Sequence, residues 1–561
     1  MEIVTRPGVW LFTAILVWIS GSAHGAGTAA ACADKCVLGE TRSVAGETWS
    51  CRLYSTSTGS PVPLSPTGMH DRARQHDAWI RKYHLPAGSI TNTVFSDTTY
   101  TDAIAFRDHG DSAEWTGLYL ASQALKLQVT GSPDAERQAE RLVESIHRLF
   151  AVTGIRGMLA RYAAPLNSGD PRLDAMYDPA QHRDHTTTYD GQEYFWVGDT
   201  SRDMYQGVAL GYGLAYEALG SPVHRELIRS DVVKLLAELI QVRRVPMLLR
   251  VNFYGEPMDI PVDVNMRYSI PNPRESVDGR VIMTIGSDGD PLNFDDSSMR
   301  GLVEFWPDYA EVIRQVPGLG FLARESIPNP EVAVMLASMF RVGILVTEGV
   351  PGYEAAHRAI RTFYDAHIQE WIGYMRNYTR FNPFETDCGQ RYYGLTIVFE
   401  PIYNLIRLED DPVIREQIRS QVLEQRIWPL VKDHKNVFFS YVQAGLAPPT
   451  EANASIAEDA TAQLGQFDAP PQPRLAHDVR ASGKYPPDTQ CPGQSTVAVD
   501  VADRAPHDFI WQRSPFVTTQ PGEPRLVYPT VDYVFPYWLG RYHGFVEDDA
   551  EGTCLRWLPA P

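Results

Sequence analysis

Acidic residues stand directly before two long apolar stretches of the sequence, where they could carry out acid–base chemistry. Asp111 and Glu114 lead into the first stretch, and Asp199 and Asp203 lead into the second. Cleavage of a glycosidic bond needs one protonated carboxyl group to assist the leaving oxygen and one ionised carboxylate to activate water or attack carbon. Burial and mutual repulsion would separate the pKa values of such a pair in the required direction. The sequence therefore predicts one catalytic carboxylate from each stretch.

Each of these carboxylates also has a structural interpretation. Aspartate is a preferred N-cap residue, which would account for Asp111 and Asp199. Arg202 would form a salt bridge with Asp203 at the end of the fold. Glu114 and Asp203 are harder to explain in this way, because each lies in the first turn of a helix that continues almost wholly apolar. We therefore expect both side chains to face the interior.

Aromatic and basic residues near the same segments are candidates for binding a sugar. The aromatic candidates are Trp115, Trp196, Tyr392 and Tyr393, and the arginine candidates are Arg161, Arg202, Arg391 and Arg541. Aromatic side chains stack on sugar faces, but at helix starts they are equally typical of a core. Arg541 lies in an aromatic segment that could instead seal the end of the fold. His182, Asp184 and His185 are interpreted as a solvated loop, and no metal or cofactor is expected.

An internal repeat indicates which elements hold these residues. Four times, an apolar helical stretch runs into a compact turn that ends in proline and continues as an amphipathic helix. The apolar stretches cover 115–127, 205–219, 332–346 and 392–408, and the helices that follow end near 150, 242, 378 and 431. Glycine suits the C-cap of the first helix, serine or aspartate the N-cap of the second, and proline its first turn.

The alternation of buried and exposed helices predicts an all-α fold. We expect an (α/α)6-type toroid of inner and outer helices, in preference to an open stack of helical hairpins. The N-termini of the inner helices would then meet at one mouth. Residues 71–83 are expected to form an outer helix, and 437–446 and 533–545 the last inner segments. Residues 247–292 are expected to form a strand-bearing insertion, and 448–506 a surface loop with little regular structure.

The chain begins with the features of a secretory signal peptide. Arg6 precedes a short apolar run over 9–19, and small residues follow at 23–25. We therefore expect a secreted or periplasmic protein, with no membrane insertion by this or any later segment. The predicted parts are the signal peptide (1–25), a cysteine-containing segment (26–70), the helical toroid (71–446), a Pro/Ala/Asp-rich loop (447–510) and a closing segment (511–561).

Charge and cysteine content narrow the function classes. The net charge of −19 repels nucleic acid, and no basic stripe offsets it. It also disfavours a polyanionic substrate, unless a local basic pocket overrides the total charge. The chain has six cysteines, which in an exported protein suggest disulfides in any of fifteen pairings. Zinc binding is the competing interpretation, and it lacks a C-x-x-C pair or a histidine partner.

Three features together resemble a known group of enzymes: apolar helices that begin with Gly-Asp-Ser or Gly-Asp-Thr, turns of the Thr-Gly-Ser-Pro type, and amphipathic partner helices. They resemble the α/α-toroid carbohydrate-active enzymes, which include six-hairpin glycosidases, unsaturated glucuronyl hydrolases, toroid polysaccharide lyases and glucuronyl epimerases. The resemblance is architectural and not specific to one family. It implies catalytic acids at the ends of the inner helices, which here fall on Asp111, Glu114, Asp199 and Asp203.

The leading hypothesis is a secreted glycoside hydrolase that acts on an oligo- or polysaccharide. The second is a polysaccharide lyase or uronyl epimerase. In that case Tyr392, Tyr393 or His109 would remove the C5 proton while Arg391 neutralises the carboxylate. The third is a non-catalytic glycan-binding or envelope interaction protein. It predicts saturable binding without bond cleavage and carboxylates that are all engaged in structural pairs.

Overall fold

The structure is a computed structural model that describes residues 41–44, 47–55, 60–61, 68–253, 256–272, 278–285, 298–318, 320, 328–378, 388, 392–546 and 553–559. The predicted signal peptide (1–25), Cys32 and Cys36 lie outside the described residues. About 51% of the chain is helical and 18% is strand, so the prediction of an all-α toroid is wrong. The strands form in the connections between helices. One of them, β7 (Asp184–Tyr189), contains three consecutive threonines, which as β-branched residues favour extended backbone.

Four helical pairs are present where the sequence predicted them. They are α2 (Ser112–Thr130) with α3 (Pro133–Ala151), α5 (Arg202–Ala218) with α6 (Pro222–Ile240), α8 (Pro330–Thr347) with α9 (Glu354–Met375), and α10 (Tyr393–Leu408) with α11 (Pro412–Glu416), a π-helix (Gln417–Ile427) and α12 (Trp428–Val431). In the first turn Gly131 ends α2 in the left-handed region, with φ 61°. The Ser132 hydroxyl oxygen then accepts a hydrogen bond from the Ala135 amide at 3.4 Å. Local capping of this kind is why the pairs can be located from sequence.

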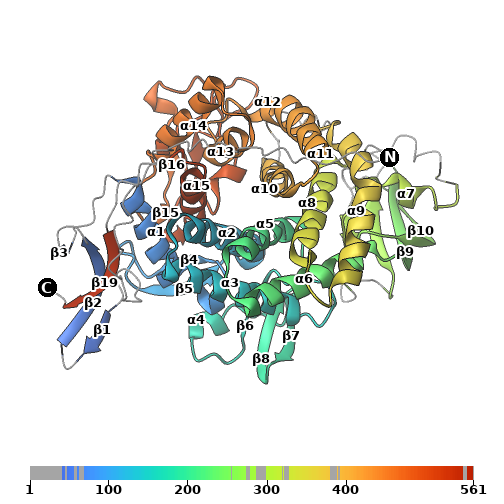
Figure 1. Ribbon diagram of the computed structural model, residues 1–561, viewed down its shortest axis with the longest axis horizontal. Helices are drawn as coiled ribbons and strands as arrows, with labels where there is room; N and C mark the ends of the chain where they lie inside the picture. Colours follow the sequence, from blue (N-terminus) through green and yellow to red (C-terminus); the bar gives the residue numbers. More distant parts are fainter. Residues whose placement is uncertain are drawn as a thin grey trace, which may run out of the picture.

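Six apolar helices contact one another in a cycle (Figure 1). α2 packs on α5, α5 on α8, α8 on α10, α10 on α13 (Val437–Leu446), α13 on α15 (Val531–Tyr542), and α15 on α2. α5 also touches α10 directly. α1 (Met69–Tyr83) and α14 (Glu451–Leu464) pack against α15. This mutual contact buries one large hydrophobic core.

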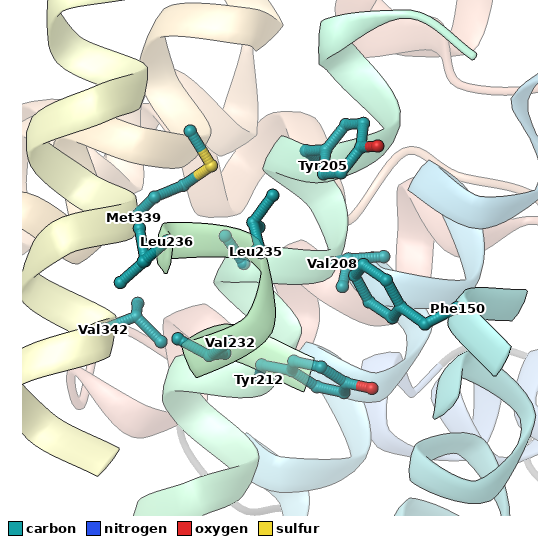
Figure 2. Close-up of a pocket in the computed structure, with 10 residues that line it drawn as sticks. Phe150, Tyr205, Val208, Tyr212, Val232, Leu235, Leu236, Met339 and Val342 are labelled. Carbon is teal, nitrogen blue, oxygen red and sulfur yellow. The ribbon is translucent and has the colours of Figure 1, made fainter. Parts of the chain in front are cut away.

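Among the residues that the structure describes, α8 is the one helix whose length and composition would allow it to cross a membrane. The expectation that no segment after the signal peptide reaches such a length is therefore wrong, although 83% of α8 is buried inside the fold. Met339 and Val342 of α8 line an apolar cavity of about 20 Å³, which Tyr205 and Tyr212 of α5 also line (Figure 2). The lining is almost wholly apolar, so this cavity offers no acid–base chemistry.

Small sheets surround the helices. The strand orders are β15-β18-β4-β5, β6-β8-β7, β10-β9-β12-β13, β11-β14, β16-β17 and β1-β2-β19, with β3 added to β2. The strands are β1 (Thr41–Val44), β2 (Glu47–Ser55), β3 (Ser60–Pro61), β4 (Asn92–Phe95), β5 (Ala103–Arg107), β6 (Tyr162–Pro165), β8 (Gln192–Val197), β9 (Arg243–Phe253), β10 (Glu256–Met266), β11 (Ser269–Pro271), β12 (Val281–Ile285), β13 (Ser298–Arg300), β14 (Leu302–Glu304), β15 (Gln472–Arg474), β16 (His477–Asp478), β17 (Thr519–Gln520), β18 (Glu523–Tyr528) and β19 (Thr553–Pro559). Short helices are α4 (Pro171–Asp174) and α7 (Ala310–Ile313), with 3-10 turns at Pro86–Gly88, His109–Asp111, Arg480–Ser482, Val501–Asp503 and Ile510–Gln512. The β9–β10 hairpin occupies the first part of the segment expected to bear strands, and its first strand begins four residues before that segment.

The segment 448–506 is more regular than predicted. α14 occupies its first part, where the Thr450 hydroxyl oxygen accepts a hydrogen bond from the Asn453 amide at 3.3 Å. Ala457 and Leu464 of this helix are buried. The prediction of little regular structure is therefore wrong for α14, because alanine-rich composition supports a helix once one face is covered.

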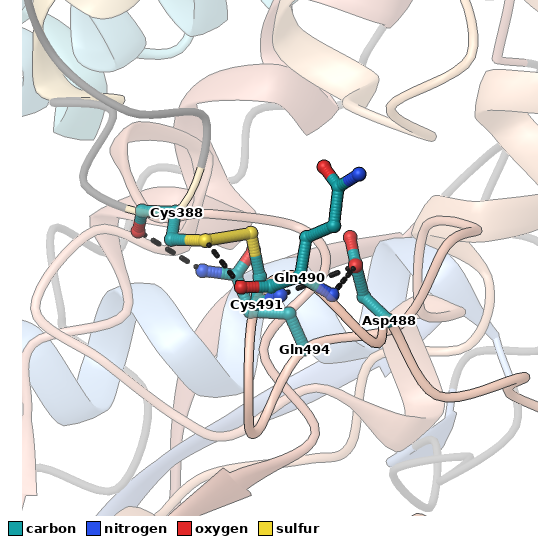
Figure 3. The surroundings of a disulfide bond; sticks show 5 residues. All are labelled: Cys388, Asp488, Gln490, Cys491 and Gln494. Carbon is teal, nitrogen blue, oxygen red and sulfur yellow. Dashed lines mark hydrogen bonds between the residues drawn. A yellow bond between two sulfur atoms is a disulfide. The ribbon is translucent and has the colours of Figure 1, made fainter.

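A disulfide joins Cys388 to Cys491, with their Cα atoms 5.1 Å apart (Figure 3). The Gln494 side-chain amide also donates a hydrogen bond to the Cys388 carbonyl oxygen at 3.2 Å. The bond ties the chain just before α10 to the segment that follows α14. Cys388–Cys491 is one of the pairings that the sequence left open.

Candidate active site

The starts of α2 and α5 are adjacent, and this brings their acidic residues together. A Cβ built on Gly207 of α5 would lie 2.4 Å from the Glu114 carbonyl oxygen of α2, so only glycine permits the approach. Glu114 is 2% exposed. Burial, followed by repulsion from Glu400 and then from Asp203 and Asp111, raises its pKa well above the usual range. Glu114, Asp203 and Asp111 therefore share one region of the molecule.

Asp111 stands at the surface of this region. Its side chain is 40% exposed. Partial burial and then repulsion from Asp203 raise the pKa of Asp111 to about 6, although the positive charge of Arg161 acts to lower it. Asp111 occupies the N-cap position of α2, but its side chain makes no capping hydrogen bond. The capping interpretation of Asp111 is therefore wrong, and its carboxyl group remains partly open to solvent.

Arg161 links the two helix starts. Its Nη1 donates hydrogen bonds to the Gly110 carbonyl oxygen at 2.6 Å and to Asp111 Oδ1 at 3.4 Å. Its Nη2 donates to Ser201 Oγ at 2.8 Å, and the Ser201 hydroxyl in turn donates to Asp203 Oδ1. The Met204 amide donates to the same oxygen of Asp203 at 3.1 Å. Arg161, predicted to bind substrate, thus orients the two partly exposed carboxylates.

Glu400 is a buried carboxylate that the sequence analysis missed. It lies in the middle of α10, is 0% exposed, and has no hydrogen-bond partner for either oxygen within the part of the chain that the structure describes. Burial and then Asp203 raise its pKa well above the usual range. One sequence feature could have revealed it, because Glu400 is the single acidic residue of an otherwise apolar helix.

Two further acids flank this region and were also missed. Burial opposes ionisation of Asp508, but its hydrogen bond with His507 and the charges of His507 and Arg513 hold the pKa of Asp508 below its usual range. Asp508 contributes to the raised pKa of Glu114. Burial raises the pKa of Asp532, in the first turn of α15, to about 8. The region therefore combines ionised and protonated carboxyl groups at neutral pH.

Asp199 does not join this group through its side chain, which is exposed. It has φ 55° and lies two residues before Ser201, the N-cap of α5, so the capping interpretation is wrong here too. Its carbonyl oxygen accepts a hydrogen bond from Arg161 Nε at 2.6 Å. Asp199 thus takes part in positioning through its backbone.

The two predicted tryptophans belong to the hydrophobic core. Trp115 stacks on Phe509 with ring centroids 4.9 Å apart, and Trp196 packs on His185 at 4.2 Å. Both tryptophans are buried. His185 lies in β7 with Asp184, so the interpretation of these two residues as a solvated loop is wrong. No group of three potential metal ligands occurs among the described residues.

The remaining predicted binding residues lie elsewhere or outside the described part. Arg202 pairs with Glu304 at 3.3 Å, so the predicted salt bridge with Asp203 is wrong. Arg541 ends α15 about 14 Å along the helix axis from Asp532. Tyr392 is buried, with its ring 5.8 Å from that of His434 and 6.2 Å from that of Phe516. Arg391 and the side chain of Tyr393 lie outside the described residues.

Comparisons with known proteins do not assign the chain to a family. No protein-family description, no curated protein and no solved structure matches it. Its function must therefore be argued from the carboxylates and the residues that hold them.

Proposed function

We propose that the chain is a secreted glycoside hydrolase in which Asp111 and Asp203 act on the glycosidic bond. The observation that carries this proposal is the link Asp111–Arg161–Ser201–Asp203, which holds two carboxylates from separate helices in one partly exposed region. Glycoside cleavage requires a fixed pair of carboxyl groups, of which one donates a proton and the other activates water or attacks carbon.

Asp111 is the proposed general acid. Burial and repulsion from Asp203 raise its pKa to about 6, which keeps a large share of Asp111 protonated in mildly acidic solution. A catalytic group works best when its pKa lies near the working pH. Asp111 would donate this proton to the leaving oxygen, and Asp203 would activate water or attack the anomeric carbon.

Glu114 and Glu400 lie behind this pair. Both are buried, and Glu114 lies one helical turn deeper than Asp111. Glu114 therefore does not block access to Asp111 from the surface. The electrostatic coupling of Glu114 to Asp111 and Asp203 means that its protonation state affects theirs. We assign these two residues a positioning role, through the field they exert on Asp111 and Asp203.

A second candidate function has one specific observation in its favour. His109 is half-buried, and burial followed by the charge of Arg183 lowers its pKa, which favours the neutral imidazole. Its Nδ1 has no hydrogen-bond partner among the described residues. A neutral imidazole near Arg161 could remove the C5 proton of a uronic acid whose carboxylate an arginine neutralises. That reaction would be a lyase or epimerase activity.

A panel of polysaccharides and oligosaccharides, assayed for reducing ends and for ultraviolet absorbance, tests both proposals. We expect reducing ends without absorbance from at least one glycan. Asp111→Asn and Asp203→Asn should each lower the rate on that glycan by about a hundredfold or more without lowering the melting temperature. Asp459→Asn, an exposed residue of α14, is the matched control and should have no effect. Unchanged turnover in both variants would refute the hydrolase, and an absorbing product would favour the lyase.

A further inference from the structure

Behind the proposed catalytic pair lies a buried polar cluster, which we define as Glu114, Gln206, Thr396 and Glu400. Their exposed fractions are 2%, 1%, 0% and 0%. Within the part of the chain that the structure describes, the amide oxygen and nitrogen of Gln206, Thr396 Oγ1 and both oxygens of Glu400 have no hydrogen-bond partner. Burial of polar atoms without hydrogen-bond partners is energetically costly, so the presence of several such atoms on neighbouring helices needs an explanation.

Contacts between α5 and α10 place Gln206 and Glu400 at a similar height along the two helices. The Asn404 side-chain amide of α10 donates a hydrogen bond to the Ala209 carbonyl oxygen of α5 at 2.9 Å. Glu400 lies one turn before Asn404, and Gln206 lies about one turn before Ala209, so both project on the same level of the two packed helices. Thr396 lies one turn further along the same face of α10.

The cluster reaches toward the surface through the acids already described. Glu400 raises the pKa of Glu114, and Asp203 raises the pKa of both residues, so these three carboxyl groups lie within electrostatic reach of one another. Asp111, with its side chain 40% exposed, precedes Glu114 by one turn. Acidic groups thus extend from the partly exposed Asp111 through Glu114 to the fully buried Glu400.

Within the residues that the structure describes, the carboxyl groups of Glu114, Glu400 and Asp203 form no hydrogen bond or salt bridge with a basic side chain. No lysine or arginine among the described residues bonds to Glu114 or Glu400, and Asp203 accepts its hydrogen bonds from a hydroxyl and an amide. A different buried acid, Asp77, is compensated by Arg81 at 2.9 Å and by Lys126 at 2.7 Å. The concentration of the Glu114, Glu400 and Asp203 carboxyl groups beside unpartnered amide and hydroxyl groups makes the polar cluster a candidate site for a positively charged ligand group.

We propose that the buried polar cluster binds a primary ammonium group, and that the glycan cleaved at this site carries free amino sugars. The second part of this inference rests on the proposed hydrolase function. A primary ammonium has three donors and no acceptor, which suits the oxygens of Glu114, Glu400, Gln206 and Thr396. A hydrogen bond between a charged donor and a carboxylate is roughly twice as strong as a neutral one.

Neutral sugar hydroxyls and buried water are the competing occupants. Either could satisfy single hydrogen bonds, but neither supplies the positive charge that three neighbouring carboxyl groups lack. Uronic acids are excluded by the same reasoning, because their carboxylate would add another negative charge. Sugars of nearly the same shape but different charge can therefore distinguish these occupants from an ammonium group.

Calorimetric titration of the full chain with glucosamine, N-acetylglucosamine and glucose makes this distinction. We expect glucosamine to bind at least about tenfold more tightly than the other two sugars, which lack its charge. A titration with methylammonium separates recognition of the ammonium alone from recognition of the whole amino sugar, and either result supports the cluster as an ammonium site. Equal affinities for the three sugars, or binding of none of them, would overturn the inference.

Two variants locate the preference. Glu400→Gln removes one carboxylate at constant shape and should abolish the preference for glucosamine, whereas Glu458→Gln, an exposed acid of α14, should retain it. Gln206→Met removes the amide oxygen at similar volume and gives an independent readout if Glu400→Gln does not fold. A preference that survives in both variants would overturn the site. Because binding is measured without turnover, glucosamine binding by a chain that cleaves no glycan would refute the hydrolase alone, and cleavage without this preference would refute the ammonium site alone.

Discussion

Gly117 of α2 and Gly207 of α5 are in backbone contact, since a Cβ on Gly117 would lie 2.2 Å from the Gly207 carbonyl carbon. Each glycine follows an acid of the site by about one helical turn, Glu114 in α2 and Asp203 in α5, so this contact sets how closely the two carboxyl groups approach. The acidic site therefore depends on two positions that carry no side chain at all.

Gly117→Ala should destabilise the protein by about 1–3 kcal/mol or more, because backbone atoms that cannot move aside occupy the space of the added methyl group. Thermal unfolding measures this loss. The matched control is Gly373→Ala in α9, whose added Cβ would meet nothing within 4 Å. It should be neutral or stabilising by about 0.5–1 kcal/mol. Equal stability of the two variants would show that α2 and α5 are not in contact.

The pH dependence of turnover should report Asp111. Since its pKa is raised to about 6 and its protonated form donates the proton, kcat/KM should fall as the pH rises above about 6. Asp203→Asn removes a negative charge that raises the pKa of Asp111. In that variant Asp111 should therefore lose its proton at lower pH, and the residual activity should fall at lower pH than in the wild type. A pH profile of the wild type and the variant checks both statements. An alkaline limb that is unchanged by the substitution would argue against coupling of the two residues.

Stability should depend on pH through Asp532. Its pKa is about 8 in the folded protein against an ordinary value of 3.8, so the folded state holds a proton that the unfolded state has released between these values. The contribution of Asp532 to the free energy of unfolding is complete below about pH 4 and is lost as the pH rises toward 8. Asp532→Asn should therefore be more stable than the wild type at pH 8, by an amount on the order of a few kcal/mol, with a smaller difference at pH 5. Denaturant unfolding at both pH values measures it, with Asp459→Asn as the exposed control.

Removal of the Cys388–Cys491 disulfide should destabilise the chain, because the bond closes a loop of 103 residues in the unfolded state. The double variant with serine at both positions should lose about 2–4 kcal/mol. Chemical unfolding should show the same loss when the wild type is measured in a reducing agent. An unchanged midpoint in both experiments would contradict the pairing.

Features decided by neighbouring residues could be predicted from the sequence, and features decided by distant ones could not. The turn from Gly131 to Pro133 was predictable because its caps lie within a few residues of one another. The strand that contains His185 was missed because its pairing partner β8 had to be known first. The all-α prediction failed for the same reason, at each connection where strands pair.

The candidate site shows the same division. Glu114 and Asp203 could be predicted because each stands at the start of a strongly apolar helix. Glu400 contributes to the same electrostatic environment from a helix almost 200 residues further along the chain than Asp203, so only the packing of α10 on α5 reveals it. Asp199 was a reasonable candidate by position, but its positive φ turns the backbone and leaves its side chain outside the group.

The most direct test of the proposed catalytic pair is kcat/KM for Asp111→Asn, Asp203→Asn and the double variant on a glycan that the wild type cleaves. If the two carboxylates act as one unit, the double variant should retain about the activity of the poorer single variant, because loss of either member already disables the reaction. Losses that multiply in the double variant, or wild-type activity in either single variant, would contradict a shared catalytic role for Asp111 and Asp203.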